Sequence, residues 1–213
     1  MGNTVLTGRR MAIMLLLYAK GASGRTNEVV EGRTRLTKLL FLLDKEHDVF
    51  QRASGLKFES YAFGPYDPKI YDDLAFLENM AWLRGSTAST APTLSFSDVM
   101  EESGKDSSVA FLDASELGEA DLSFEYLMSG VAEDFPERYE TRKYALSDKG
   151  LQSIEGAIAA MRGNKDFPKL MSAIEEVKAR YNHLPLRDLL RSVYKKYPDS
   201  ASDSTILDQL RVS

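Results

Sequence analysis

The fold is decided by residues 32–83, which read GRTRLTKLLFLLDKEHDVF (32–50), FESYAFGPYDP (58–68) and KIYDDLAFLENMAWL (69–83). The first piece carries an apolar stripe at steps of three and four residues, which is typical of an amphipathic helix. The stripe consists of Leu36, Leu39, Leu40, Leu43, His47 and Phe50. It predicts one helix over residues 34–50.

The second and third pieces predict a strand, a turn and another helix. Residues 56–63 alternate in the manner of a short strand. Gly64-Pro65 predicts a turn, because both residues interrupt regular structure. Asp67 before Pro68 predicts a helix over residues 68–84, because the carboxylate can cap it and proline fits its first positions.

The whole chain predicts a mainly α (α+β) fold, a helical bundle with a winged-helix-like core, a small β element and an acidic insertion. The other predicted elements are a helix at 6–20, a strand at 142–146, a helix capped by Ser147, and helices at 167–181 and 186–197. We divide the chain into a helical core with the Gly-Pro-Tyr turn (1–85), an acidic insertion (86–140), a strand and C-terminal helices that close the same domain (141–198), and a tail (199–213).

Charge is distributed unevenly along the chain. Residues 86–140 hold 13 acidic and two basic side chains, a charge of −11, so the rest of the chain carries +6 within a net charge of −5. Such a segment is typical of a solvated region, and less often of an arm that mimics a phosphate surface.

Composition points to a cytoplasmic protein. The 213 residues include no cysteine, so disulfides and cysteine-ligated zinc are excluded. The apolar run of residues 11–19 is too short for a bilayer, which needs about 20 residues. Arg9 and Arg10 before it resemble the start of a signal peptide. The apolar residues of the run fall on one helical face, however, which favours a packed first helix. We expect no membrane partner.

The chain shows no pattern of catalytic residues. It has no Gly-x-Ser-x-Gly sequence and no glycine-rich phosphate loop, so we expect no enzyme and no cofactor. Asp44, His47 and Asp48 share one face of the predicted helix, but a single histidine makes a poor zinc site. We therefore predict no metal.

Nucleic-acid binding is a competing hypothesis. Residues 1–57 contain ten basic and five acidic side chains, and Arg33, Arg35 and Lys38 open the predicted helix at 34–50. A basic helix start can contact phosphates. Against this, the sequence pI of about 5.2 is low for a dedicated DNA-binding protein.

Aromatic residues around the turn form the clearest candidate for a binding site. Tyrosine and phenylalanine offer a large rigid area, and such residues are enriched in binding hot spots. The alternative is that these rings only pack the strand against the next helix. The predicted partner-binding residues are Tyr61, Phe63, Gly64, Pro65, Tyr66 and Tyr71.

Several segments, in this order, resemble the Panacea (SocA-like antitoxin) domain and the related YwgA-type proteins. They are Lys38-Leu39-Leu40-Phe41, residues 58–61, Phe63-Gly64-Pro65-Tyr66, Ile70-Tyr71 with Leu74, residues 144–150 (YALSDKG) and residues 185–198 (PLRDLLRSVYKKYP). The resemblance covers about half of the chain. The acidic insertion is not part of the short core of that family.

The resemblance implies a mainly helical, non-enzymatic module that binds proteins, since Panacea members neutralise toxins or serve as adaptors. We therefore expect an antitoxin-like or adaptor regulator in a defence or toxin–antitoxin locus, with a toxin or effector protein as partner. The alternative is a winged-helix transcriptional regulator that binds DNA. The oligomeric state is left open.

Overall fold

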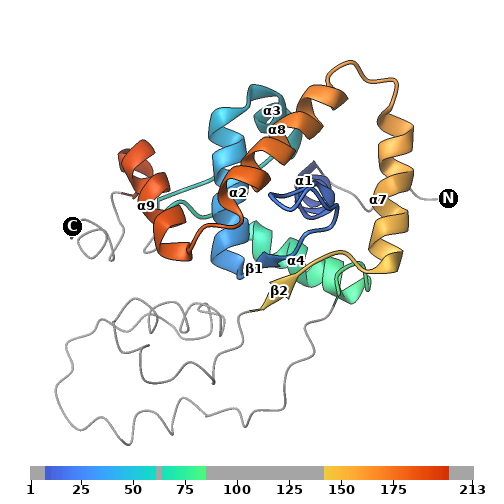
Figure 1. The fold of residues 1–213 in the computed structure, drawn as a ribbon, viewed down its shortest axis with the longest axis horizontal. Coiled ribbons are helices and arrows are strands. Elements are labelled where there is room, and N and C mark those ends of the chain that lie inside the picture. The colour runs from blue at the N-terminus through green and yellow to red at the C-terminus, as the bar shows by residue number, and fades with distance from the viewer. Residues whose placement is uncertain (1–7, 61–63, 85–141, 202–213) are drawn as a thin grey trace, which may run out of the picture. The chain divides into compact units, whose positions relative to one another are not determined.

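The computed structural model describes residues 8–60, 64–84 and 142–201 (Figure 1). In this part of the chain the fold is mainly helical, as predicted, and includes one small sheet. The elements are α1 (Gly8–Tyr18), β1 (Val30–Glu31), α2 (Arg33–Glu46), α3 (Asp48–Ser54), α4 (Lys69–Asn79), β2 (Lys143–Tyr144), α7 (Asp148–Met161), α8 (Phe167–Tyr181), α9 (Leu186–Lys196) and the 3-10 helix η2 (Pro198–Ala201). The predicted insertion and most of the predicted tail lie outside the described residues.

Two helices that are buried nearly all round form the centre of the fold. In α1 every residue from Ala12 to Leu17 is buried, and in α2 residues 35–44 are all buried. Helices that are buried on nearly every side lie at the centre of a fold, covered by other elements. α8 packs against both of them, and Ile174 and Val177 are among its buried residues. The apolar run of residues 11–19 is therefore a packed first helix, as predicted.

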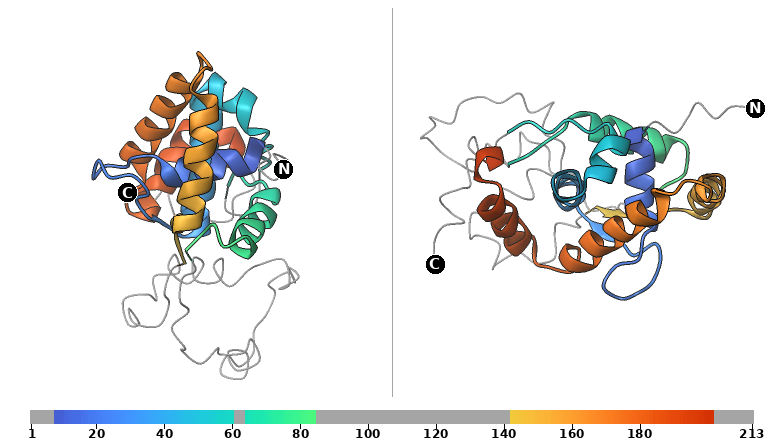
Figure 2. Two further views of the ribbon diagram at one scale, coloured as in Figure 1. Left: turned by 90° about the vertical axis from the view of Figure 1, so that its right-hand side faces the viewer. Right: turned by 90° about the horizontal axis from the view of Figure 1, so that it is seen from above.

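The remaining helices surround this centre. α9 and α7 lie at opposite ends of the described fold, with α1, α2 and α8 between them (Figure 2). α9 packs against α2, and its buried residues are Leu189, Leu190, Val193 and Tyr194. Within the described residues, none of these helices has the length and apolar character needed to cross a membrane.

The predicted helix over residues 34–50 is wrong as one element. α2 ends at Glu46, and His47 takes an extended conformation with φ −135° before α3 begins. The amides of Phe50 and Gln51 both donate to the carbonyl of His47, which starts the new helix. The stripe is continuous in sequence because Leu43 before the break and Phe50 after it are both buried.

The predicted strand at 56–63 and helix at 68–84 are also corrected. The strand reduces to one antiparallel bridge between Glu59 and Tyr66, and residues 61–63 lie outside the described part. The helix ends at Asn79, and Ala81 adopts φ 56°. The amide of Trp82 then donates to the carbonyl of Leu77 over 2.9 Å, the bond that closes many helix ends.

The sheet joins distant parts of the chain. β1 pairs with β2 in antiparallel register, with Val30 opposite Tyr144, and Leu83 forms a bridge with Leu146. The predicted strand at 142–146 is thus confirmed in part. These pairings bring the start of the fold next to the segment that follows the insertion.

Ser147 caps α7, as predicted. Its hydroxyl accepts a hydrogen bond from the amide of Gly150 at 3.0 Å, and its own amide donates to the carbonyl of Trp82 at 2.9 Å. This brings the first turn of α7 against the backbone at Trp82. A Cβ on Gly150 would lie only 2.1 Å from the Trp82 carbonyl oxygen, so glycine is required here.

A buried carboxylate ties α1 to α4. Asp73 is 1% exposed and forms ion pairs with Arg9 and with Arg10, the latter over 2.7 Å. The guanidinium of Arg10 also lies 3.7 Å from the centre of the Phe76 ring. The two arginines that resembled a signal-peptide start therefore hold the first helix in the fold.

Replacing residues 87–138 by a short Gly-Ser linker should preserve cooperative unfolding. The two ends of the body already meet, because the amide of Arg84 donates to the carbonyl of Ala145 over 2.8 Å. Closing a short loop between adjacent ends costs little entropy. Thermal denaturation followed by circular dichroism checks this. A broad, non-cooperative transition would show instead that part of the insertion completes the core.

Candidate partner-binding surface at the Gly-Pro-Tyr turn

The turn belongs to a short segment between α3 and α4, called the arm here, in which residues 57–60 lie beside residues 64–67 and are joined to them by backbone hydrogen bonds. Glu59 and Tyr66 exchange two amide-to-carbonyl hydrogen bonds, each 2.9 Å long. The carboxylate of Asp67, which is 3% exposed, accepts hydrogen bonds from the amides of Lys57 and Lys69 at 2.9 and 3.0 Å. Asp67 therefore fixes the base of the arm and the start of α4 together.

Gly64 and Pro65 are wedged between α2 and α9. Gly64 has φ 78°, and a Cβ there would lie 2.5 Å from the Tyr194 ring of α9. Lys38 of α2 is 2% exposed and donates from Nζ to the carbonyl oxygen of Pro65 at 2.9 Å. Both turn residues are buried. They shape the predicted site, but a partner cannot reach them in this structure.

Tyr66 and Tyr71 are the predicted site residues that the structure leaves accessible. Both are half-buried, and their rings meet edge to face with centres 5.2 Å apart. Tyr61 and Phe63 lie outside the described residues. The Arg33 guanidinium lies 5.1 Å from the Tyr71 ring centre, which adds a cation to the pair. We call Arg33, Tyr66 and Tyr71 the aromatic surface.

Arg33 is oriented by a buried tyrosine. Its Nε donates to the hydroxyl of Tyr144 in β2 over 3.1 Å. Burial lowers the pKa of Arg33, but this hydrogen bond and the nearby Tyr71 and Glu78 outweigh burial, so the pKa is raised. The side chain is half-buried and always charged. Its other N–H groups can therefore serve a partner's acceptor beside the two rings.

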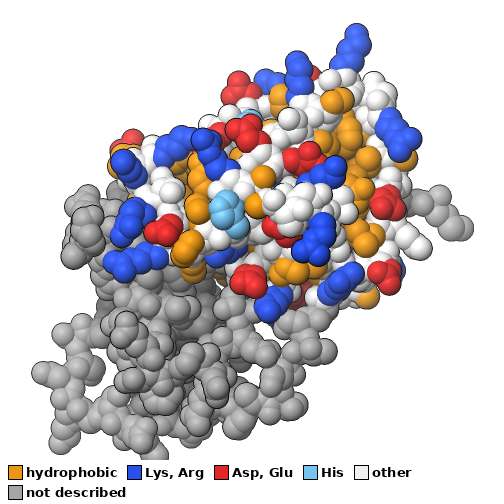
Figure 3. Space-filling view, viewed as in Figure 1, with side chains coloured by type: hydrophobic (Ala, Val, Ile, Leu, Met, Phe, Trp, Pro, Cys, Tyr) orange, Lys and Arg blue, Asp and Glu red, His pale blue; other side chains and the backbone are white. Residues whose placement is uncertain are grey.

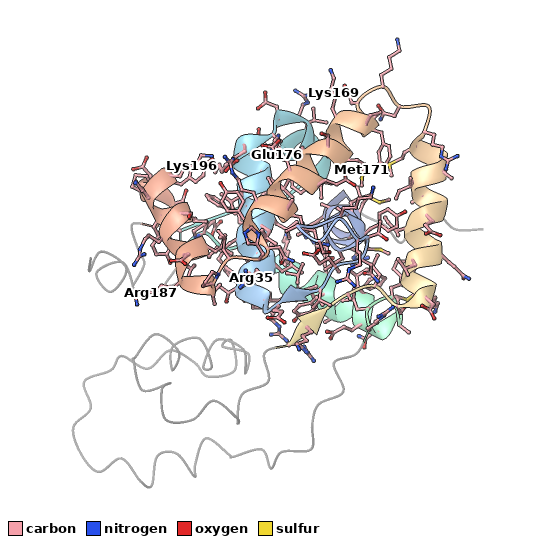
Figure 4. All side chains as sticks on the ribbon, in the orientation of Figure 1. Arg35, Lys169, Met171, Glu176, Arg187 and Lys196 are labelled. Atoms are coloured by element: carbon pink, nitrogen blue, oxygen red, sulfur yellow. The ribbon has the colours of Figure 1, made fainter. Side chains whose placement is uncertain are left out.

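The other two predicted phosphate contacts are structural. Arg35 is 9% exposed, and its Nη1 donates to the carbonyls of Asn182 and Leu184 at 2.8 and 2.7 Å, just beyond the end of α8. Lys38 donates a hydrogen bond to the carbonyl oxygen of Pro65 in the turn. Figure 4 shows Arg35 lying toward the loop between α8 and α9. Neither side chain is placed to contact a phosphate, which corrects the prediction for Arg35 and Lys38.

Three of the six segments that carried the family resemblance meet at the ring of Phe41. Phe41 of α2 contacts Phe58 of the arm and Tyr197 after α9, edge to face, with both pairs of ring centres 5.3 Å apart. The contact of Gly64 with Tyr194 adds a fourth segment to this packed unit. Much of the sequence pattern is therefore explained by packing.

Buried charged groups were not predicted from sequence. Lys178 of α8 is 0% exposed, and its Nζ donates to the carbonyls of Leu17 and Ala19 at 2.8 and 2.9 Å. Burial lowers the pKa of Lys178 to about 8, although Glu28 acts in the opposite direction. Lysine on an otherwise apolar helix face was the available signal, since such a residue must find acceptors.

Asp44 and His47 do not form the shared helix face that the sequence suggested, because α2 ends between them. Burial raises the pKa of Asp44, which is 8% exposed. In the part of the chain that is described, no three His, Asp or Glu side chains are grouped to hold a metal ion. His47 lines a shallow open pocket of about 410 Å³ together with α8, which contributes residues between Pro168 and Glu176 (Figure 4). Neither Tyr66 nor Tyr71 is part of that pocket.

Comparison of the chain with family models, with curated proteins and with solved structures gave no match. The resemblance of its segments to the Panacea and YwgA-type proteins therefore stays a prediction from sequence.

Proposed function

We infer that this chain is a non-enzymatic, protein-binding regulator, antitoxin-like or an adaptor, which holds its partner on the aromatic surface. The observation that carries the proposal is the pair of half-exposed rings, Tyr66 and Tyr71, on a backbone locked by Lys38 and Tyr194. A rigid aromatic anchor loses little conformational entropy on binding. The partner would be a toxin or effector from a defence or toxin–antitoxin locus.

Arg33 defines what the partner should present. A guanidinium with unused N–H groups beside two rings favours an apolar side chain next to a carboxylate. α4 offers the surrounding polar rim, with Lys69 and Asp72 exposed. This is the arrangement of a protein interface with a small central anchor.

Tyr66→Ala should weaken partner binding by about 2 kcal/mol or more, or roughly 30-fold, while the fold stays intact, because a hot-spot tyrosine contributes mostly to the interface. The product of the neighbouring gene is the first partner to test, by titration calorimetry with purified proteins. Tyr18→Ala, a half-buried tyrosine at the end of α1, is the control. The opposite result would be a Tyr66→Ala protein whose free energy of unfolding is lower by several kcal/mol but whose folded fraction binds normally. That result would assign the ring to the core alone.

A winged-helix regulator that binds DNA is the second candidate. It is supported by the order of the elements along the chain: α1, β1, the helices α2 to α4, the bridge residue Leu83, the insertion and then β2. The segment of β2 pairs with β1 and, through Leu146, with Leu83. The insertion would then take the place of the wing. α4, which precedes the bridge, would be the recognition helix, but its accessible charged residues are one cation, Lys69, against Asp72 and Glu78, while Asp73 is buried and paired with two arginines. That charge repels phosphates, so we rank this candidate second. Absence of a mobility shift with the native upstream DNA at low salt would eliminate it.

A further inference from the structure

α9 has two faces of opposite character. Leu189, Leu190, Val193 and Tyr194 are buried, and every exposed residue on the helix is charged. The exposed ones are Arg187, Lys195 and Lys196 against one acid, Asp188, and with the half-buried Arg191 the basic side chains gather over α9 in the space-filling view (Figure 3). Arg187, Arg191 and Lys195 follow one another at steps of four, so they form a row with about 6 Å between neighbours. We call these three residues and Lys196 the basic row.

Two members of the basic row have local partners. Arg191 pairs with Asp188 at 3.5 Å, and Lys196 pairs with Glu46 of α2 at 2.7 Å. Among the described residues, Arg187 and Lys195 have no ion-pair partner within 4.0 Å. Figure 4 shows Arg187 and Lys196 near opposite ends of the helix. The row therefore spans α9 and is only partly neutralised.

Helix stability does not account for the whole row. Lys195 and Lys196 stand in the last turn, where the helix dipole favours cations. Arg187 stands in the first turn, where the same dipole disfavours a cation. The helix dipole therefore does not account for Arg187, which extends the row along the full length of the helix.

We propose that the basic row binds the phosphodiester backbone of a nucleic acid without reading its sequence. Regularly spaced cations are sufficient for phosphate contacts. A protein partner would need an apolar or aromatic anchor, and a membrane would need the apolar face of the helix. α9 offers neither, because its apolar side chains are all turned into the fold or half-buried. This function is separate from the aromatic surface and from the winged-helix candidate, which uses α4 and the sheet.

The test is fluorescence anisotropy of the full chain with a labelled duplex DNA and a labelled single-stranded RNA of equal length. Three phosphate contacts predict a slope of about −2.7 for log K against log salt on duplex, or roughly 40-fold weaker binding at 200 than at 50 mM salt. The triple variant Arg187→Glu, Arg191→Glu, Lys195→Glu should abolish binding to both probes. No binding of the wild-type chain at 50 mM salt overturns the proposal.

A matched control separates the row from net charge. Arg162→Glu, Lys165→Glu, Lys169→Glu changes the total charge equally on exposed residues near the connection of α7 and α8, and it should leave the salt slope unchanged. An equal loss of binding in this control overturns the proposal. The proposal is also overturned if substitutions of Arg84 and Lys143, beside the sheet, weaken binding while the triple variant in α9 does not. Stronger binding to polyglutamate than to either nucleic acid would assign the row to an acidic protein instead. If the triple variant is unfolded by circular dichroism, Arg187→Gln with Lys195→Gln should still reduce the slope by about 1.8.

Discussion

Gly150→Ala is expected to lower the free energy of unfolding by about 3 kcal/mol or more, as severe overpacking does. The added Cβ would lie 2.1 Å from the carbonyl oxygen of Trp82. That oxygen cannot move away easily, because it also accepts the hydrogen bond from the amide of Ser147. Relief would require the first turn of α7 to shift from the bridge between Leu83 and Leu146. Chemical denaturation with a linear extrapolation measures the change.

Gly156→Ala in the same helix provides a control with the opposite sign. Nothing lies within 4 Å of a Cβ at this exposed position. Alanine there should stabilise the protein by about 0.5–1 kcal/mol, the ordinary helix preference over glycine. Equal effects of the two substitutions would contradict the close approach of α7 to Trp82.

Lys178→Ala is expected to lower the free energy of unfolding by about 2 kcal/mol at pH 7. It removes the donor for the carbonyls of Leu17 and Ala19 and leaves a cavity, while it also relieves the cost of a buried charge. Lys169→Ala on the exposed side of α8 is the control, and it should change stability by less than about 0.5 kcal/mol.

The deficit of Lys178→Ala should widen by about 3 kcal/mol as the pH rises from 8 to 10.5. The folded pKa of Lys178 is about 8, below its ordinary 10.5, so the unfolded chain binds more protons between these values. Wild-type stability therefore gains from this group as pH rises through the window, at about 1.4 kcal/mol per pKa unit. The neutral amine still has two N–H donors for the two carbonyls. Denaturation of both proteins from pH 7 to 10.5 tests this, and a constant difference would contradict the lowered pKa.

Local signals predicted the helices well, and contacts across the chain decided their limits. Ser147 was recognised as a cap because its side chain acts within three residues. The break at His47 was missed, because the apolar stripe continues through it when only spacing is read. The end of α4 was misplaced since Ala81 carries no sequence sign of its φ of 56°.

The candidate site was predicted in part for the same reason. Gly64-Pro65 marked the turn, yet its burial depends on Lys38 and Tyr194, which come from elements far away in sequence. Arg33 was predicted as a phosphate contact from its place at the start of a helix, and the structure adds that it lies beside Tyr71. Spacing along one helix can show which residues share a face. It cannot show which neighbour covers that face.

The hydrogen bonds of Lys178 also have a consequence for synthesis of the chain. The carbonyls that end the first helix are satisfied by a side chain 161 residues later. At the usual ribosomal rate of about 5–20 residues per second, α1 emerges roughly 8–30 s before its cap exists. During that interval its buried face, from Ala12 to Leu17, has no covering helix from α8. Apolar surface that is exposed in this way favours aggregation, and a chain that stops before Lys178 would lack the side-chain donor for the carbonyls of Leu17 and Ala19.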